Sequence, residues 1–242
     1  MHHEPSDVVI LCGGLGTRLQ PVLKDRPKPM APINGRPFLD LVVDHILSNG
    51  FRRIVFCTGH HGNWIAQHVR RRTDCETIIS QEATPLGTAG ALRGCRSQLT
   101  TATTLVLNGD SLCRIDLQAL LARHRHRQAV ATMAVIPSND RTDAGGVRMD
   151  ELGWIRSFQE KHRGTFLNAG IYAIETQAIH LIPDSVPCSL ERDVFPRLVD
   201  GRLYGYPCQV PLYDIGTPER LAAFEALDKE TPEHHYTTSL SQ

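Results

Sequence analysis

The chain has 242 residues, 41% of them hydrophobic and 21% charged, which is the balance of an ordinary globular protein. Its 26 basic and 26 acidic side chains cancel, which argues against a broadly basic nucleic-acid binder or a polybasic membrane-surface protein. No apolar run approaches the ~18 residues of a membrane span, and the N-terminus lacks a secretory signal. The seven cysteines are scattered, with no Cys-x-x-Cys pair, so we expect free thiols and a cytoplasmic protein. From the balanced charge and the lack of a membrane span we expect neither nucleic acid nor membrane as a partner.

Short apolar runs alternate with helical patterns through the first 136 residues. The apolar runs predict strands at 8–11, 54–57, 77–80, 104–107 and 130–136. Apolar residues at helical spacing predict helices at 36–48, 63–71, 88–97 and 117–125. This alternation with short connections predicts an α/β fold, a Rossmann-like, mostly parallel mixed sheet flanked by helices on both faces.

The pattern changes after residue 137 and becomes rich in strands. Strands are predicted at 146–149, 154–159 and 166–174, with a hairpin turn at 150–153. Helices are predicted at 190–199 and from residue 218 onward, followed by a polar tail at 231–242. We therefore expect a single domain over residues 1–230, with one half at about 7–136 and a β-rich half at 137–230.

A glycine-rich loop follows the first predicted strand. The glycines of residues 13–16 let backbone N–H groups approach a phosphate or a base, and Arg18 adds positive charge. The loop lacks the Gly-Lys-Ser/Thr ending of a P-loop, and Leu19 replaces the third glycine of a dinucleotide fingerprint. Lys28 lies between two prolines, which stiffen the loop that carries it. These features predict a phosphate-binding loop of another kind.

Six motifs occur in a fixed order along most of residues 7–225. They are Gly-Gly-Leu-Gly-Thr-Arg-Leu at 13–19 followed by Pro-Lys-Pro-Met-Ala-Pro at 27–32, Pro-Leu-Gly-Thr-Ala-Gly at 85–90, Asn-Gly-Asp at 108–110, Glu-Lys at 160–161, Asn-Ala-Gly-Ile-Tyr at 168–172, and Asp-Ile-Gly-Thr-Pro at 214–218. Together they resemble the signature of the sugar-1-phosphate nucleotidylyltransferases. The segment 28–40 is most similar to the D-glycero-α-D-manno-heptose 1-phosphate guanylyltransferases.

The resemblance implies a fold, a reaction and a pathway class. The fold is that of nucleotide-diphospho-sugar transferases, with a nucleotide-binding half at about 7–136 and a sugar-binding half at 137–230. The reaction joins GTP and the heptose 1-phosphate to give GDP-heptose and pyrophosphate, for a capsule, O-antigen or S-layer glycan. Because a sugar phosphate is already an anion, it needs positioning and positive charge more than a general base.

The same resemblance assigns catalytic and metal-binding residues. Arg18 would face the triphosphate, and Lys28 the α-phosphate or the sugar phosphate. Asp110, the third catalytic residue, would hold Mg²⁺ together with Asp214, since this hard ion prefers oxygen ligands. The two carboxylates are far apart in the sequence, so only the fold can bring them together.

The resemblance also assigns residues to the two substrates. The nucleotide-binding set is Leu11, Gly13, Gly14, Gly16, Thr17, Glu82, Gly87, Thr88 and Asn108. Glu82 stands where related enzymes place a base-reading side chain, and its carboxylate suits the N1–H and N2–H₂ groups of guanine; Gln81 is an alternative reader. The sugar-binding set is Gly146, Glu160, Lys161, Asn168 and Asp214. Relatives often carry an aromatic residue before this glycine, where the present chain has Gly145.

Several of these side chains have simpler interpretations. Asp110 and Asp214 could cap helices, and Glu160 with Lys161 could be a surface ion pair. Histidines 60 and 61 suit a turn or a helix cap as well as ligation, and histidines 124 and 126 suggest a solvated helix end.

Other functions also stay open. The same signature fits a mannose 1-phosphate guanylyltransferase or a uridylyltransferase, and a nucleotide-sugar sensor that lacks activity is the alternative from another class. A homodimer is possible.

Overall fold

The computed structural model describes residues 6–14, 16–138, 145–159, 164–199 and 201–230. Within these ranges nine strands form one sheet: β1 (Asp7–Leu11), β4 (Arg53–Thr58), β5 (Glu76–Gln81), β6 (Thr103–Asn108), β8 (Ala131–Pro137), β9 (Gly146–Met149), β10 (Ile155–Gln159), β11 (Phe166–Glu175) and β12 (Leu203–Pro207). The helices are α1 (Gln20–Leu23), α2 (Phe38–Ser48), α3 (Gly62–Val69), α4 (Gly87–Gly94), α5 (Leu117–Arg127), α6 (Thr176–Ile179) and α7 (Pro218–Glu230). Two small sheets pair β2 (Pro32–Ile33) with β3 (Arg36–Pro37) and β7 (Ser111–Cys113) with β13 (Leu212–Asp214).

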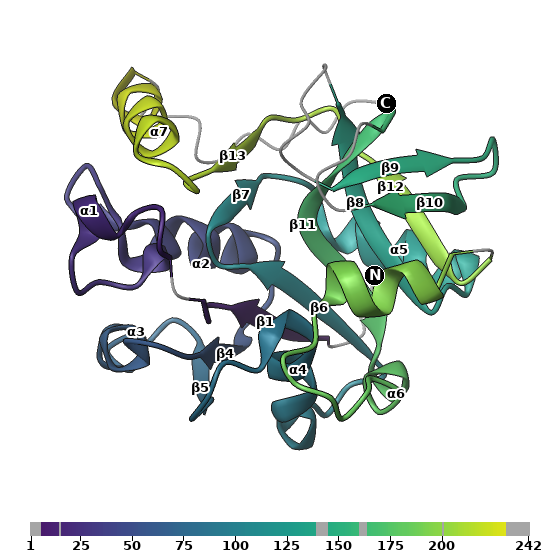
Figure 1. Ribbon diagram of the computed structural model, residues 1–242, viewed down its shortest axis with the longest axis horizontal. Coiled ribbons are helices and arrows are strands. Elements are labelled where there is room, and N and C mark those ends of the chain that lie inside the picture. Colours follow the sequence, from purple (N-terminus) through teal and green to yellow (C-terminus); the bar gives the residue numbers. More distant parts are fainter. Residues whose placement is uncertain (1–5, 15, 139–144, 160–163, 200, 231–242) are drawn as a thin grey trace.

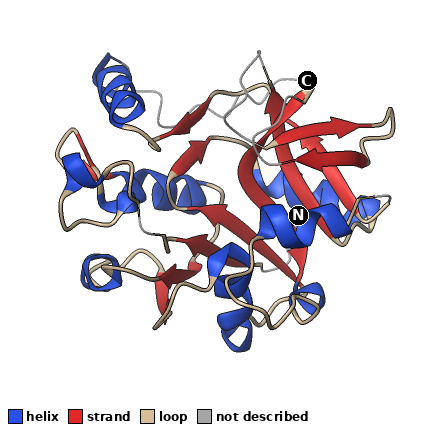
Figure 2. Cartoon of the chain, viewed as in Figure 1, coloured by secondary structure: helices blue, strands red, loops and turns tan. Residues whose placement is uncertain are grey.

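The strands of the large sheet are parallel on one side of β6 and mostly antiparallel on the other. Strand β1 lies between β6 and β4, and β5 follows β4, all of them parallel. The long strand β11 is antiparallel to β6 and to β8 and also pairs with β9, so it joins the two predicted halves in one sheet. The β9–β10 hairpin projects from this second half (Figure 2). The predicted α/β fold, a mixed sheet flanked by helices, is confirmed.

Helices cover both faces of the sheet because the residues of its strands alternate in direction. Val8 and Ile10 of β1 belong to the same apolar cluster as Phe38 and Leu39 of α2. Their neighbours Val9 and Leu11 belong to a second cluster, which contains Ala89 and Leu92 of α4. Figure 1 shows α2 and α4 on opposite sides of β1. None of the described helices is long and apolar enough to cross a lipid bilayer.

The predicted elements of the first half are found with boundaries shifted by a few residues. The hairpin turn at 150–153 is also present, and its Gly153 has a φ of +90°, which favours glycine. Strands β7, β12 and β13 were not predicted. The predicted helix at 190–199 is wrong: a π-helical turn at Leu190–Val194 is followed by a 3₁₀ turn at Phe195–Arg197. Pro196 has no N–H to donate along a continuous helix, which accounts for the break.

The interpretation of His124 as part of a solvated helix end is also wrong. Its side chain is fully buried under the sheet. Nδ1 lies 2.9 Å from Oγ1 of Thr132 and Nε2 lies 3.0 Å from Oε1 of Glu175. Burial lowers the pKa of His124. Both ring nitrogens therefore have partners in the core, and the residue connects α5 to β8 and β11.

Candidate active site

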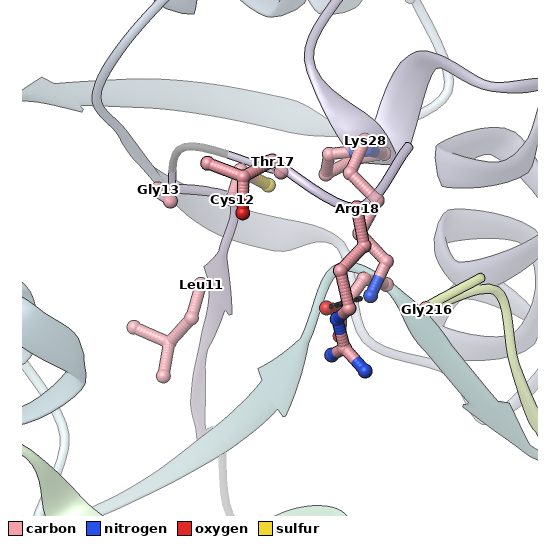
Figure 3. Close-up of a pocket in the computed structure, with 11 residues that line it drawn as sticks. Leu11, Cys12, Gly13, Thr17, Arg18, Lys28 and Gly216 are labelled. Carbon is pink, nitrogen blue, oxygen red and sulfur yellow. Dashed lines mark hydrogen bonds and ion pairs between the residues drawn. The ribbon is translucent and has the colours of Figure 1, made fainter. Parts of the chain in front are cut away.

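The carboxyl ends of β1, β4, β5 and β6 meet at one edge of the sheet, the usual place for ligands in a parallel α/β sheet. A cavity of about 200 Å³ opens there. Its lining includes nearly all of the predicted phosphate loop and residues from other segments. The lining residues are Leu11, Cys12, Gly13, Gly14, Gly16, Thr17, Arg18, Lys28, Pro29, Asp110 and Gly216. Figure 3 shows the side chains of Arg18 and Lys28 extending to the same side of this loop. The cavity is smaller than the ~300–1,000 Å³ of a complete ligand pocket, so a nucleotide with its sugar would extend beyond it.

Lys28 stands between the two aspartates that the sequence singled out. Its Nζ lies 2.6 Å from Oδ2 of Asp110 and 3.7 Å from Oδ1 of Asp214. Its side chain is only 14% exposed, because prolines on both sides hold it in a 3₁₀ turn, Lys28–Met30. The structure thus brings the three predicted residues together.

A small sheet explains how the two aspartates meet. Strand β7 starts directly after Asp110, and antiparallel pairing sets Asp214 of β13 opposite Ser111. The backbone N–H of Ile215 donates to the carbonyl of Asp110 at 3.2 Å. The alternative roles as helix caps are wrong, since Ser111 opens a strand, and Asp214 ends one and bonds to the side chain of Arg220.

Asp110 and Asp214 are the two carboxylates beside Lys28, and carboxylate oxygens are ligands that a hard divalent cation prefers. Oδ1 of Asp214 accepts a hydrogen bond from the backbone N–H of Gly216 at 2.5 Å, and Oδ2 accepts one from Arg220 at 2.9 Å. These contacts fix the carboxylate while its neighbour Asp110 is 40% exposed toward the cavity. In the described part of the chain no group of three or more His, Cys, Asp or Glu side chains is placed so that it could hold a metal ion. A divalent cation held by Asp110 and Asp214 alone would need phosphate or water oxygens to complete its coordination.

The other predicted nucleotide-binding residues lie outside this cavity lining. Glu82 follows β5, and its Oε2 accepts a hydrogen bond from the N–H of Leu86 at 3.2 Å. Burial raises the pKa of the Glu82 carboxyl. Gly87 has a φ of +76° and contacts the backbone of Cys188 so closely that a Cβ would lie 2.3 Å from its carbonyl oxygen. The hydroxyl of Thr88 donates to Glu191 at 2.9 Å.

The described residues of the sugar-binding set lie on β9 (Gly146), β11 (Asn168) and β13 (Asp214). Asn168 accepts a hydrogen bond from the N–H of Gly170 through Oδ1 and donates through Nδ2 to the Tyr172 hydroxyl at 2.7 Å. A Cβ on Gly170 would lie 2.8 Å from Nδ2 of Asn108, so this part of β11 passes beside the strand that leads to Asp110. Oδ1 of Asn108 is buried without a hydrogen-bond partner among the described residues, which leaves an acceptor at this position. Glu160 and Lys161 lie outside the described residues.

The wall beside Gly146 contains an aromatic ring from a neighbouring strand. The ring of Phe158, on β10, lies 2.9 Å from the position of a Cβ on Gly145. A large side chain at position 145 would therefore collide with this ring. An aromatic group occupies the region, but it comes from the neighbouring strand.

Comparison with known proteins agrees with this arrangement. The family model described as nucleotidyl transferase matches residues 7–230. The chain belongs to the nucleotidyl transferase family. Because its relatives are named as guanylyltransferases and uridylyltransferases of sugar 1-phosphates, the enzyme class predicted from the motifs is confirmed.

Two relatives of this nucleotidyl transferase have different named substrates. A mannose-1-phosphate guanylyltransferase from Mycobacterium tuberculosis is 34% identical over 221 residues, covering 88% of the chain and 62% of the relative. A D-glycero-alpha-D-manno-heptose 1-phosphate guanylyltransferase from Aneurinibacillus thermoaerophilus is 30% identical over 217 residues, covering 88% of the chain and 94% of the relative. The chain thus spans less than two thirds of the first relative and nearly all of the second.

The solved structure of HddC from Yersinia pseudotuberculosis has the same fold as this nucleotidyl transferase. Its TM-score is 0.81 at 28% sequence identity, and the match covers 93% of the chain and 99% of HddC. HddC has also been solved in complex with GMP-PN, with the same TM-score.

Sequence reasoning missed one residue that links the two halves of this nucleotidyl transferase. Glu191 accepts hydrogen bonds from the hydroxyls of Thr88 at 2.9 Å and Ser189 at 2.8 Å, and from the buried Tyr172 hydroxyl at 3.4 Å. It therefore connects α4 of the first half to β11 of the second. Its segment reads as an ordinary amphipathic helix in the sequence, and no signal there could have revealed the contact.

Proposed function

We propose that this nucleotidyl transferase transfers a guanylyl group from GTP to D-glycero-α-D-manno-heptose 1-phosphate, releasing pyrophosphate. The observation that carries the proposal is the placement of Lys28 between Asp110 and Asp214 beside a glycine-rich loop. This is a positively charged, positioned group next to two oxygen donors, which suits attack of one phosphate on another.

The glycine loop and the charged residues at the cavity then have distinct tasks. Backbone N–H groups of the glycine loop and the guanidinium of Arg18 would bind the triphosphate. Lys28 would neutralise charge where the sugar phosphate meets the α-phosphate. Asp110 and Asp214 would hold Mg²⁺, which lowers the repulsion between the two anions and the charge on the departing pyrophosphate.

The choice of GTP rests on Glu82 and on the relatives. A carboxylate accepts two hydrogen bonds from the guanine edge, whereas uracil offers a single N–H there. The named guanylyltransferases among the relatives support the same base, although a UTP--glucose-1-phosphate uridylyltransferase from Synechocystis is 32% identical over 230 residues.

The choice of the heptose rests on the share of each relative's length that the match covers. The heptose enzyme from A. thermoaerophilus and HddC match over nearly their whole lengths, whereas the match to the mannose enzyme of M. tuberculosis covers 62% of that protein. Mannose 1-phosphate is the second candidate, since the mannose enzyme is 34% identical to the chain and the heptose enzyme is 30% identical.

The proposal extends to the cellular setting. All seven cysteines are free thiols in the structure, which supports a reducing compartment such as the cytoplasm. A GDP-heptose made there would supply a surface polysaccharide.

Pyrophosphate release with Mg²⁺ tests the proposal. GTP, UTP, CTP, ATP and dTTP are crossed with the 1-phosphates of the heptose, mannose, glucose and N-acetylglucosamine, with the Asp110→Ala variant as the inactive control. We expect release with GTP and the heptose phosphate, reduced on omission of Mg²⁺. Preference for UTP would overturn the guanylyl assignment, preference for mannose would change the sugar, and no release with any pair would favour the sensor.

A further inference from the structure

The Glu82 carboxylate packs against two loops that have no side chain at the point of contact. Oε1 lies 2.4 Å from the position that a Cβ on Gly59 would take, and 3.1 Å from that of a Cβ on Gly13. Real Cβ atoms essentially never approach a heavy atom within 3.0 Å. The carboxylate can therefore occupy this position only while residue 59 is glycine.

The three residues meet because their strands are neighbours. Gly13 follows β1, Gly59 follows β4 and Glu82 follows β5, and these strands lie side by side and parallel. Gly13 also lines the cavity that contains Lys28. The carboxylate thus lies beside the wall of that cavity, next to the loops that follow β1 and β4.

The two oxygens of this carboxylate differ in their hydrogen bonding. Oε2 accepts the N–H of Leu86, whereas within the described part of the chain no hydrogen bond reaches Oε1. The N–H of Glu82 donates to the carbonyl of Thr58 at 2.8 Å, so the backbone is fixed and only the side chain can move away.

We propose that Gly59 is a specificity-determining position for the nucleotide base, because its missing side chain lets the Glu82 carboxylate face the guanine edge. This inference rests on the proposed use of GTP. An alanine at position 59 would displace Oε1, Cδ and Cγ of Glu82, which lie 2.4, 3.2 and 3.3 Å from the new Cβ. The φ of Gly59 is not in the left-handed region, so the backbone accepts alanine. The three atoms nearest to the new Cβ all belong to Glu82.

Calorimetric titration with GTP and ITP in the presence of Mg²⁺ tests this without any sugar phosphate. ITP lacks the 2-amino group, so it reports one of the two hydrogen bonds to the carboxylate. The wild type should bind GTP about 10- to 100-fold more tightly than ITP, the range for a hydrogen bond to a charged group. In G59A and in E82A that ratio should fall toward one, and the double variant G59A/E82A should match E82A.

Gly94→Ala is the matched control. Gly94 ends α4, and its added Cβ would meet only Leu86 at an ordinary 3.6 Å, so the ratio should stay at the wild-type value. A wild-type ratio in G59A would overturn the inference, as would an equal loss of GTP affinity with and without Glu82. If G59A unfolds, recovery in G59A/E82A would support the contact and continued unfolding would contradict it. A wild-type protein that does not distinguish GTP from ITP would instead contradict guanine reading, and with it the proposed function.

Discussion

At the scale of single residues, Lys28 has the most constrained position in the site. It reaches Asp110 at 2.6 Å and Asp214 at 3.7 Å while its own side chain is almost buried. A lysine held in this way presents its charge at a fixed point and loses little entropy when a phosphate arrives. The cluster is thus prepared for an anion before the substrate binds.

Replacing Lys28 by alanine should lower kcat by about 10²–10³, since a positioned charge that stabilises the transition state is lost. GTP binding should fall much less, because the glycine loop and Arg18 remain. Pyrophosphate release and calorimetric titration of GTP measure the two effects. Lys24→Ala is the control, an exposed lysine in the same loop. A K28A protein that binds GTP and turns over at the wild-type rate would refute the catalytic role.

Burial also sets the protonation of His45 in α2. The side chain is 8% exposed and its Nε2 has no hydrogen-bond partner among the described residues. Burial, with a smaller contribution from the charge of Arg114, lowers the pKa of His45 to about 4. The unfolded chain therefore binds a proton near pH 6.5 that the folded protein does not bind until about pH 4.

This difference predicts a loss of stability in acid. The contribution of His45 is fully present above pH 6.5 and is lost as pH falls toward 4, by about 3 kcal/mol in all. In urea titrations between pH 7 and pH 4, the free energy of unfolding of the wild type should fall by that amount more than that of His45→Gln. Parallel curves for the two proteins would show that His45 does not titrate on unfolding.

At the scale of elements, the irregular segment Leu190–Val194 connects the two predicted halves. The N–H of Leu190 donates to Thr88 at 2.8 Å, and Glu191 bonds to Thr88 and Tyr172. Tyr172 accepts the amide of Asn168, so its own proton is directed to the acceptor-only carboxylate of Glu191. A chain of hydrogen bonds therefore runs from α4 to Asn168 on β11.

Tyr172→Phe removes the central hydroxyl of this chain. We expect the free energy of unfolding to fall by about 1–3 kcal/mol, because buried polar partners are left unsatisfied. If Asn168 contacts the sugar, KM for the sugar phosphate should rise several-fold with KM for GTP unchanged. Tyr204→Phe is the control, since it removes the hydroxyl of another buried tyrosine, on β12. Equal effects of the two changes on urea unfolding would contradict the argument.

At the scale of the whole molecule, the large sheet crosses the border between the predicted halves. Strand β11 pairs on one edge with β6, over Ile171–Glu175, and with β9, over Phe166 and Leu167, and it pairs on the other edge with β8. A sheet shared in this way gives neither half a complete edge or core of its own. The two parts should therefore unfold together.

The two tryptophans test this, since Trp64 lies in the first half and Trp154 in the second. Trp64→Phe and Trp154→Phe each leave one fluorescent reporter. We expect the remaining tryptophan in each variant to show the same urea midpoint as circular dichroism of that variant. A different urea midpoint for the tryptophan of each half would demonstrate two independently unfolding domains.

The sequence by itself predicted most strands, the order of the layers and the phosphate loop. Alternating periods and glycine positions are local properties, so Val8–Leu11 and the loop after it could be recognised from a few neighbouring residues. Local patterns failed where distant contacts decide the structure. The prediction of a helix at 190–199 neglected Pro196, whose missing N–H breaks a continuous helix, and the basic neighbours of His124 suggested exposure where the packing buries it.

Which of these residues meet depends on the tertiary structure. Asp110 and Asp214 converge on Lys28 because β7 pairs with β13, and this pairing is fixed by the path of the chain. The contact of Glu82 with Gly59, and that of Glu191 with Thr88 and Tyr172, likewise join different elements. Composition and periodicity report how each segment buries its apolar side chains. Which side chains from different segments come within hydrogen-bond distance depends on how the segments pack, and that is settled only when the whole chain folds.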